Sequence, residues 1–301
     1  MIALISLLGI GMPAGLVLTD SDDDTSDDSA ASGPTDTAGN SIEPEFLGTS
    51  GNDLLFGTGA AEAIMADDGN DSVDARGGDD RIEGNDGNDD IDGGDGDDNL
   101  FGDAGNDRLM GGVGDDFSHG GADDDTLVDG RGSDHLVGGQ GDDLIIGSGI
   151  FDLGRYEDFV QGRLTASSVE EVDQLLDYDI TRDTDTAGDT INAGAGDDGI
   201  IFGIDDTVTG GDGADSFETG IWLEDESDQA TITDFTGTDD RLIYYYLEGE
   251  PDPDLEVVTR DNNTGGTDAF LVANGEEVVR LVNAGGDFNI EDHVTLIARP
   301  A

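Results

Sequence analysis

A nine-residue pattern dominates the chain from residue 48 onward. Written in nines, residues 48–146 read GTSGNDLLF, GTGAAEAIM, ADDGNDSVD, ARGGDDRIE, GNDGNDDID, GGDGDDNLF, GDAGNDRLM, GGVGDDFSH, GGADDDTLV, DGRGSDHLV and GGQGDDLII, without an insertion. The eighth position is aliphatic in ten of these eleven windows, and the fourth is glycine in nine. The sixth is aspartate in ten and Glu62 in the other. A period held this long is typical of a repeat architecture.

Each window predicts one turn and one short strand. The first six residues form the turn, where glycine permits positive φ and a close approach of the backbone. The last three form a strand whose single apolar side chain, at position eight, faces inward. Two windows complete one coil, so residues eighteen apart stack about 4.8 Å from each other. Residues 48–149 therefore predict an all-β fold, a right-handed parallel β-roll.

The pattern is interrupted once and then resumes. Residues 150–183 leave it, and the run SSVEEVDQLLDY combines a Ser-x-x-Glu capping box with apolar residues at helical spacing. We expect a short amphipathic helix over residues 168–178, packed on the roll or, alternatively, binding a partner. The pattern then returns as TDTAGDTIN, AGAGDDGII, an eight-residue FGIDDTVT and GGDGADSFE. These windows predict a second repeat block and cap over residues 184–227.

The two ends of the chain have other patterns. Residues 228–301 contain alternating, β-branched and aromatic runs such as RLIYYYL and EEVVRLVN, with a hairpin signal, NG, at 274–275. They predict a C-terminal antiparallel β module. Residues 1–18 hold an uncharged run that predicts an apolar export leader or a short membrane anchor, the alternative being a peripheral segment or a misassigned start. Residues 19–47 predict an acidic, disordered linker.

Composition restricts the partners. The chain has 73 acidic and 11 basic residues, a formal net charge of −62, and 57 of its acids are aspartate. Such a charge excludes nucleic acid as a partner and disfavours anionic membrane surfaces. It also destabilises a compact state unless cations neutralise it. Composition alone would fit a disordered chain, but the strict period argues against that. Cysteine is absent, so disulfides, zinc–thiolate sites and thiol nucleophiles are excluded.

The carboxylates at position six are the candidate metal ligands. Stacked one coil apart, they repel one another unless cations lie between them. Ca²⁺ fits because it accepts six to eight oxygen ligands in irregular geometry, whereas Mg²⁺ wants a tighter octahedron. The predicted ligands lie in two columns, which Glu62 joins, and in the later windows: Asp53, Asp71, Asp89, Asp107, Asp125 and Asp143; Asp80, Asp98, Asp116 and Asp134; then Asp189, Asp198, Asp206 and Asp215.

Two further arguments concern calcium. An EF-hand loop needs a glutamate at its twelfth position, and no glutamate occurs between Glu83 and Glu157, so this rival calcium motif is rejected. One apolar side chain in nine residues buries too little surface to offset the conformational entropy lost on folding. Metal binding must therefore contribute to folding itself, and we expect the repeats to fold at about 0.1–1 mM Ca²⁺, the range of extracellular modules.

The columns match the motif G-G-x-G-x-D-x-U-x. The chain therefore resembles the RTX, or hemolysin-type, calcium-binding repeat proteins that bacterial type I systems secrete. The resemblance implies several calcium ions held by the position-six aspartates, with glycine carbonyls completing the shell, and an extracellular or cell-surface location. The segment TITDFTGTDDRL after the repeats also resembles its counterpart in that family.

Enzyme signals are missing from the sequence. It has neither the H-E-x-x-H motif of metallopeptidases nor the G-x-S-x-G motif of hydrolases. The metal-binding pattern accounts for the paired carboxylates, and His119 and His135, at variable repeat positions, are expected at the surface. We expect no catalytic activity. Trp222 is expected to pack at the end of the roll, or alternatively to stack on carbohydrate.

Two functions remain. The first is a secreted or cell-surface structural protein whose repeats fold on extracellular calcium. The second is a calcium-dependent module that binds carbohydrate or matrix, which exposed aromatics and arginines on one face would favour. The arginines of the repeats look scattered around the coil, which favours the first function: Arg76, Arg81, Arg108 and Arg131.

Overall fold

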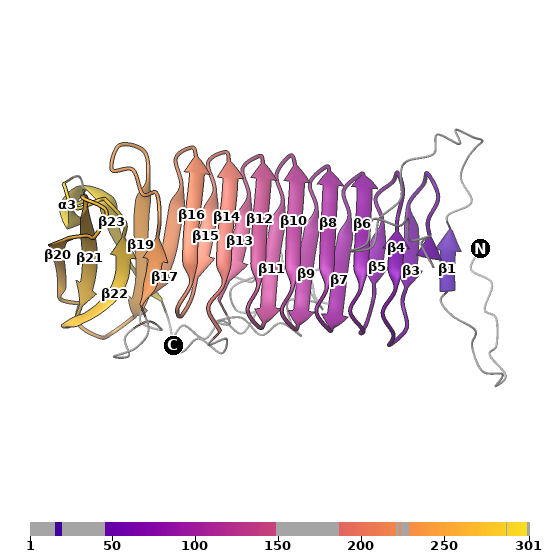
Figure 1. Cartoon of the computed structure of the whole chain (residues 1–301), viewed down its shortest axis with the longest axis horizontal. Coiled ribbons are helices and arrows are strands. Elements are labelled where there is room, and N and C mark those ends of the chain that lie inside the picture. Colours follow the sequence, from indigo (N-terminus) through magenta and orange to yellow (C-terminus); the bar gives the residue numbers. More distant parts are fainter. Residues whose placement is uncertain are drawn as a thin grey trace.

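The computed structural model describes residues 16–19, 46–148, 187–220, 223, 229–286 and 288–299. Within these residues the protein is an elongated stack of strands, with β1 at one end and the C-terminal strands at the other (Figure 1). The predicted helix over residues 168–178, most of the linker, Trp222 and most of the apolar N-terminal run lie outside the described residues. No helix in the described part of the chain has the length and hydropathy needed to span a bilayer.

Successive strands alternate between two sheets, as a coil of two windows requires. The first sheet contains, in spatial order, β1 (Leu16–Thr19), β3 (Asp53–Phe56), β5 (Ser72–Asp74), β7 (Asp90–Asp95), β9 (Arg108–Val113), β11 (Thr126–Arg131), β13 (Leu144–Gly147), β15 (Gly199–Phe202), β17 (Ser216–Gly220), β19 (Arg241–Leu247) and β23 (Val294–Arg299). The second contains β2 (Phe46–Leu47), β4 (Ala63–Met65), β6 (Arg81–Asp86), β8 (Asn99–Ala104), β10 (Phe117–Ala122), β12 (His135–Gln140), β14 (Thr190–Ala195), β16 (Thr207–Asp212), β18 (Ala230–Ile232), β22 (Glu276–Leu281), β21 (Thr267–Ala273) and β20 (Leu255–Asp261).

The pairing confirms the predicted parallel roll. In the first sheet β5 and β7 are parallel with Val73 opposite Ile91, and in the second β6 and β8 are parallel with Ile82 opposite Leu100. Each of these pairs is eighteen residues apart, which is two windows. The strands of the inner coils extend from position seven into the next window and are six residues long, rather than the three that the sequence pattern predicts.

The core consists of one row of position-eight side chains from each sheet. They are at most 2 % exposed in the first block and fully buried in the second: Leu55, Ile64, Val73, Ile82, Ile91, Leu100, Leu109, Leu127, Leu136 and Ile145, then Ile191, Ile200, Val208 and Phe217. Ser118 occupies the same position and is equally buried, and its hydroxyl has no hydrogen-bond partner among the described residues.

The roll continues across the interruption in the sequence. His135 of β12 lies opposite Thr190 of β14, and Leu144 of β13 lies opposite Gly199 of β15, both in parallel pairs. The chain therefore re-enters both sheets one coil further on. At the N-terminal end β1 pairs antiparallel with β3, so four residues from the end of the apolar run and the start of the linker form an edge strand.

The C-terminal segment contains the predicted antiparallel strands together with parallel ones. Only β20, β21 and β22 pair antiparallel, with Asn274 and Gly275 at positive φ in the hairpin turn that NG predicts. By contrast, β18, β19 and β23 continue the two sheets of the roll in parallel. A short helix, α3 (Ile290–His293), precedes β23. The antiparallel strands thus extend the roll instead of forming a separate sheet.

Candidate metal centre

The predicted aspartates form two ladders along the roll. The backbone N–H of each position-six residue donates to Oδ1 of the equivalent residue one coil later, over 2.7–3.1 Å. The first ladder runs through Asp53, Asp71, Asp89, Asp107, Asp125, Asp143, Asp198 and Asp215, and the second through Glu62, Asp80, Asp98, Asp116, Asp134, Asp189 and Asp206. The structure therefore brings all fourteen predicted residues together in the expected columns.

The second oxygen of these carboxylates is buried without a donor. In nine ladder aspartates Oδ2 is inaccessible to solvent and has no hydrogen-bond partner within the described residues: Asp71, Asp80, Asp89, Asp98, Asp107, Asp116, Asp125, Asp143 and Asp198. These side chains are only 1–3 % exposed. Because an unpaired buried carboxylate is very costly, such groups are normally paired with a cation or bound to a metal. Each ladder leaves one such oxygen per inner coil for that purpose.

Backbone carbonyls lie beside these oxygens. A methyl group built on Gly102 would lie 2.3 Å from Oδ2 of Asp107 and 2.7 Å from the carbonyl oxygen of Gly120. One built on Gly93 would meet Oδ2 of Asp98 at 2.5 Å. The glycine at position one thus keeps free a space lined by carboxylate and carbonyl oxygens. An all-oxygen donor set of this kind fits Ca²⁺.

The environment makes the ladder carboxyls unusually basic in the absence of a cation. Burial raises the pKa of Asp107 to about 8; the N–H of Asp89 lowers this pKa, and the neighbouring carboxylates of Asp89 and Asp125 raise it. Burial likewise raises the pKa of Asp116 to about 7 and that of Asp98 to about 6. A cation in the ladder would reverse this effect by favouring the ionised form.

One residue of the ladders was not predicted from the sequence. Asp240 accepts from the N–H of Asp215 at Oδ1 (3.0 Å) and from the N–H of Thr236 at Oδ2 (2.7 Å), so it extends the first ladder by one step. It follows Asp215 by 25 residues, outside any nine-residue window. The signal that could have found it is the segment TITDFTGTDDRL, in which it lies.

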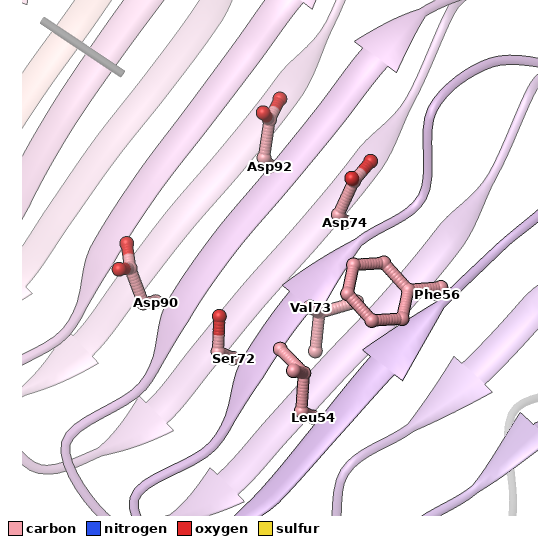
Figure 2. Close-up of a pocket in the computed structure, with 7 residues that line it drawn as sticks. All are labelled: Leu54, Phe56, Ser72, Val73, Asp74, Asp90 and Asp92. Carbon is pink, nitrogen blue, oxygen red and sulfur yellow. The ribbon is translucent and has the colours of Figure 1, made fainter. Parts of the chain in front are cut away.

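A second set of carboxylates lies on the outside of the roll. Asp74, Asp90 and Asp92 line a depression of about 360 Å³ over β3, β5 and β7, together with Leu54 and Phe56 (Figure 2). They occupy positions seven and nine, so they face away from the ladders. Asp90 forms an ion pair with Arg108 at 2.8 Å. These acids are separate from the metal-ligand columns.

The outer face of the second sheet carries aromatic side chains instead. The ring of Phe117 stacks on that of His135 at 5.4 Å between centroids and lies 5.6 Å from the ring of Phe101. The guanidinium of Arg81 lies 4.3 Å from the Phe101 centroid, and His119 contacts the edge of the same ring. His119 is half-buried and His135 exposed, in agreement with their predicted surface placement. Arg81 is thus part of a group that the sequence did not reveal.

A family model matches the coils that carry the ladders. The model of the RTX calcium-binding nonapeptide repeat matches residues 47–82, 56–91, 83–118, 119–149 and 205–221. No curated protein sequence matches the chain. Among solved structures, the AlgE6R3 subunit of the Azotobacter vinelandii mannuronan C5-epimerase is 16 % identical over 84 % of each chain, with a TM-score of 0.19. The extracellular lipase LipA of Serratia marcescens is 14 % identical over 77 % of this chain and 45 % of its own, with a TM-score of 0.25.

The repeat match covers both ladders of the first block and the last window of the second. In the first block it coincides with the coils in which buried carboxylate oxygens lack donors among the described residues. The chain therefore contains RTX calcium-binding nonapeptide repeats, and calcium is the cofactor of these repeats.

Proposed function

We propose that this chain is a secreted or cell-surface structural protein whose roll folds when it meets extracellular calcium. The observation that carries the proposal is the row of buried Oδ2 atoms that lack hydrogen-bond donors within the described residues. Without cations these carboxylates repel one another and oppose burial. With cations between the coils, the same carboxylates hold neighbouring coils together, so metal binding and folding become one event.

The proposed ligands are the fourteen predicted aspartates, with carbonyl oxygens of the turns beside them. Sites of extracellular modules have dissociation constants of about 0.1–1 mM, so the roll would stay unfolded where calcium is scarce. This property suits a chain that is exported unfolded, as in type I secretion, which the RTX family association suggests. A leader or anchor at residues 1–18, followed by a linker at residues 19–47, would also place the roll outside the cell. The roll itself then acts as a spacer without catalysis.

Calcium titration of the full chain tests this proposal. After EDTA treatment at pH 7.5, far-ultraviolet circular dichroism should show a largely unfolded chain. Strand signal should appear cooperatively with a midpoint of about 0.1–1 mM Ca²⁺. The same concentration of Mg²⁺ serves as the control and should give little signal, because Mg²⁺ retains its water and demands a tighter octahedron. A spectrum that calcium leaves unchanged would contradict the proposal.

A second function, calcium-dependent binding of a carbohydrate, is favoured by one observation. Phe101, Phe117 and His135 present ring systems on one outer face, beside Arg81, on a chain that is otherwise strongly acidic. Aromatic rings supply large, rigid contact surfaces with a defined stacking geometry. The net charge of −62 would repel anionic polymers, so the ligand that fits is a neutral polysaccharide.

Binding to a panel of neutral glycans in 5 mM Ca²⁺ tests this second function. Phe117→Ala should weaken binding by about tenfold or more, since it removes the central ring of the row. Phe56→Ala is the matched control, because Phe56 lies on the outer face of the other sheet, where Arg76 covers its ring at 5.4 Å. If no glycan binds, or if both variants lose binding equally, the aromatic row only stabilises the sheet.

A further inference from the structure

Asp129 stands where nearly all other windows have glycine or alanine. It occupies position one of the window DGRGSDHLV, the place that Gly102, Gly111, Gly120 and Gly138 hold in other windows. Its side chain is 1 % exposed. Burying an extra carboxylate in an already acidic core is unfavourable unless the carboxylate has a partner.

Position one directs a side chain into the metal ladder. A methyl group built on Gly120 would lie 2.3 Å from Oδ2 of Asp125, and one on Gly138 would lie 2.3 Å from Oδ2 of Asp143. In each case the contact is with the position-six residue of the same window. At Asp129 the side chain follows this direction, and ligand oxygens of Asp129, Asp134 and Asp189 all lie within 4.8 Å of one another.

The carboxylate of Asp129 is only half satisfied. Its Oδ1 accepts from the N–H of Gly130 at 2.5 Å, whereas its Oδ2 is buried without a hydrogen-bond donor among the described residues. None of the ion pairs formed within the described part of the chain involves Asp129. Burial and the charge of Asp189 hold the pKa of Asp129 well above its ordinary range. A cation is the partner that this oxygen lacks.

The cluster lies where the second ladder crosses the interruption in the repeats. Asp134 donates its N–H to Asp189 across 55 residues, whereas the step is eighteen residues throughout the first block. A methyl group on Gly147, close to where the chain leaves the roll, would lie 3.6 Å from Oδ2 of Asp129. Together with the step from Asp143 to Asp198, which also spans 55 residues, this is where the loop that must be closed is longest and the entropic cost of pairing the coils is greatest.

We propose that Asp129 is an additional calcium ligand, which turns the step between Asp134 and Asp189 into a three-carboxylate site that binds Ca²⁺ more tightly than the other steps of the ladders. More carboxylates in a rigid oxygen site raise calcium affinity. The site joins the coils on either side of the interruption when it fills. This inference rests on the proposed function, since it assigns one residue within the calcium-binding roll.

Calorimetric calcium titration of the full chain with two variants tests the proposal. Asp129→Gly restores the residue typical of the column, and Asp129→Asn keeps the shape while removing the charge. The wild type should show one class of site that fills before the rest. In both variants this class should lose about tenfold or more in affinity, while the remaining sites keep theirs. In EDTA neither variant should be less structured than the wild type, because each removes a buried charge.

The outcomes separate the possible failures. If Asp129→Asn gives the isotherm of the wild type while the wild type folds on calcium, Asp129 is a protonated hydrogen-bond partner of Asp189 and the inference is wrong. If both variants lose structure in EDTA at pH 5, where the metal-free fold is favoured, as well as in calcium, Asp129 supports the fold and not the ion. If the wild type itself binds no calcium, the proposed function fails.

Discussion

Lowering the pH from 8 to 5 is expected to weaken calcium binding to the folded roll by about 100-fold or more. Burial raises the pKa of Asp71, Asp80, Asp116 and Asp125 to about 7 in the absence of a cation, and that of Asp107 to about 8. Calcium binds the ionised carboxylate, so each ion must displace these protons. At pH 5 a carboxyl with a pKa of about 7 is ionised about 1 % of the time, which accounts for the factor of about 100 per displaced proton.

The metal-free chain should respond to pH in the opposite direction. An unfolded aspartate has a pKa of about 3.9, so between pH 4 and pH 8 the folded ladder binds more protons than the unfolded chain. The stability of the metal-free fold therefore falls as the pH rises through this window and is greatest near pH 4. Acid and calcium are thus two separate ways of removing the same charge repulsion.

Calcium titrations followed by circular dichroism at pH 8, 7, 6 and 5, each with an EDTA-treated sample, measure both effects. The calcium midpoint should rise as the pH falls, while the metal-free sample should gain strand signal. Magnesium at the same ionic strength controls for screening. A calcium midpoint that does not move between pH 8 and pH 5 would show that the buried carboxyls are not the ligands.

The regular part of the metal centre could be predicted from the sequence because one period determines it. Two windows per coil bring Asp89 beside Asp107 and Asp98 beside Asp116, and the same period buries Leu100 and Leu109. No long-range information is needed, since each coil contacts mainly its neighbours. The interruption at residues 150–183 did not disturb the prediction either, because the repeats resume after it and both ladders continue, with steps of 17 residues where one window has eight.

The features that the sequence did not predict lie outside the nine-residue repeat or depart from it. Asp240 joins the first ladder after a step of 25 residues, so only the fold shows its place. The alternation in RLIYYYL is equally compatible with parallel and antiparallel pairing, but the last coil of the roll leaves unpaired backbone groups at its edge. Strands β19 and β23 satisfy those groups in parallel. Asp129 and Ser118 each differ from the residue type usual at their position in the repeat. The role of such a single difference can be inferred only from the residues that surround it in the fold.

Gly105→Ala is expected to destabilise the calcium-bound roll by at least about 2 kcal/mol. Gly105 occupies position four with a φ of +121°, which L-residues rarely adopt. A methyl group there would lie 1.7 Å from the carbonyl oxygen of Gly87, one coil earlier. Backbone strain and overpacking each cost about 1–3 kcal/mol, and here neither can be relieved without moving a neighbouring coil.

Gly51→Ala provides a matched control for this prediction. Gly51 occupies the same position four, in the first window, but its backbone is outside the left-handed region and a methyl group there would meet no atom within 4 Å. In 10 mM Ca²⁺, Gly105→Ala should melt roughly 4 °C or more below the wild type. Gly51→Ala should melt with the wild type. If the two variants behave alike, the close approach of successive coils at position four does not hold in solution, and stacking of the turns cannot be what brings the buried carboxylates together around calcium.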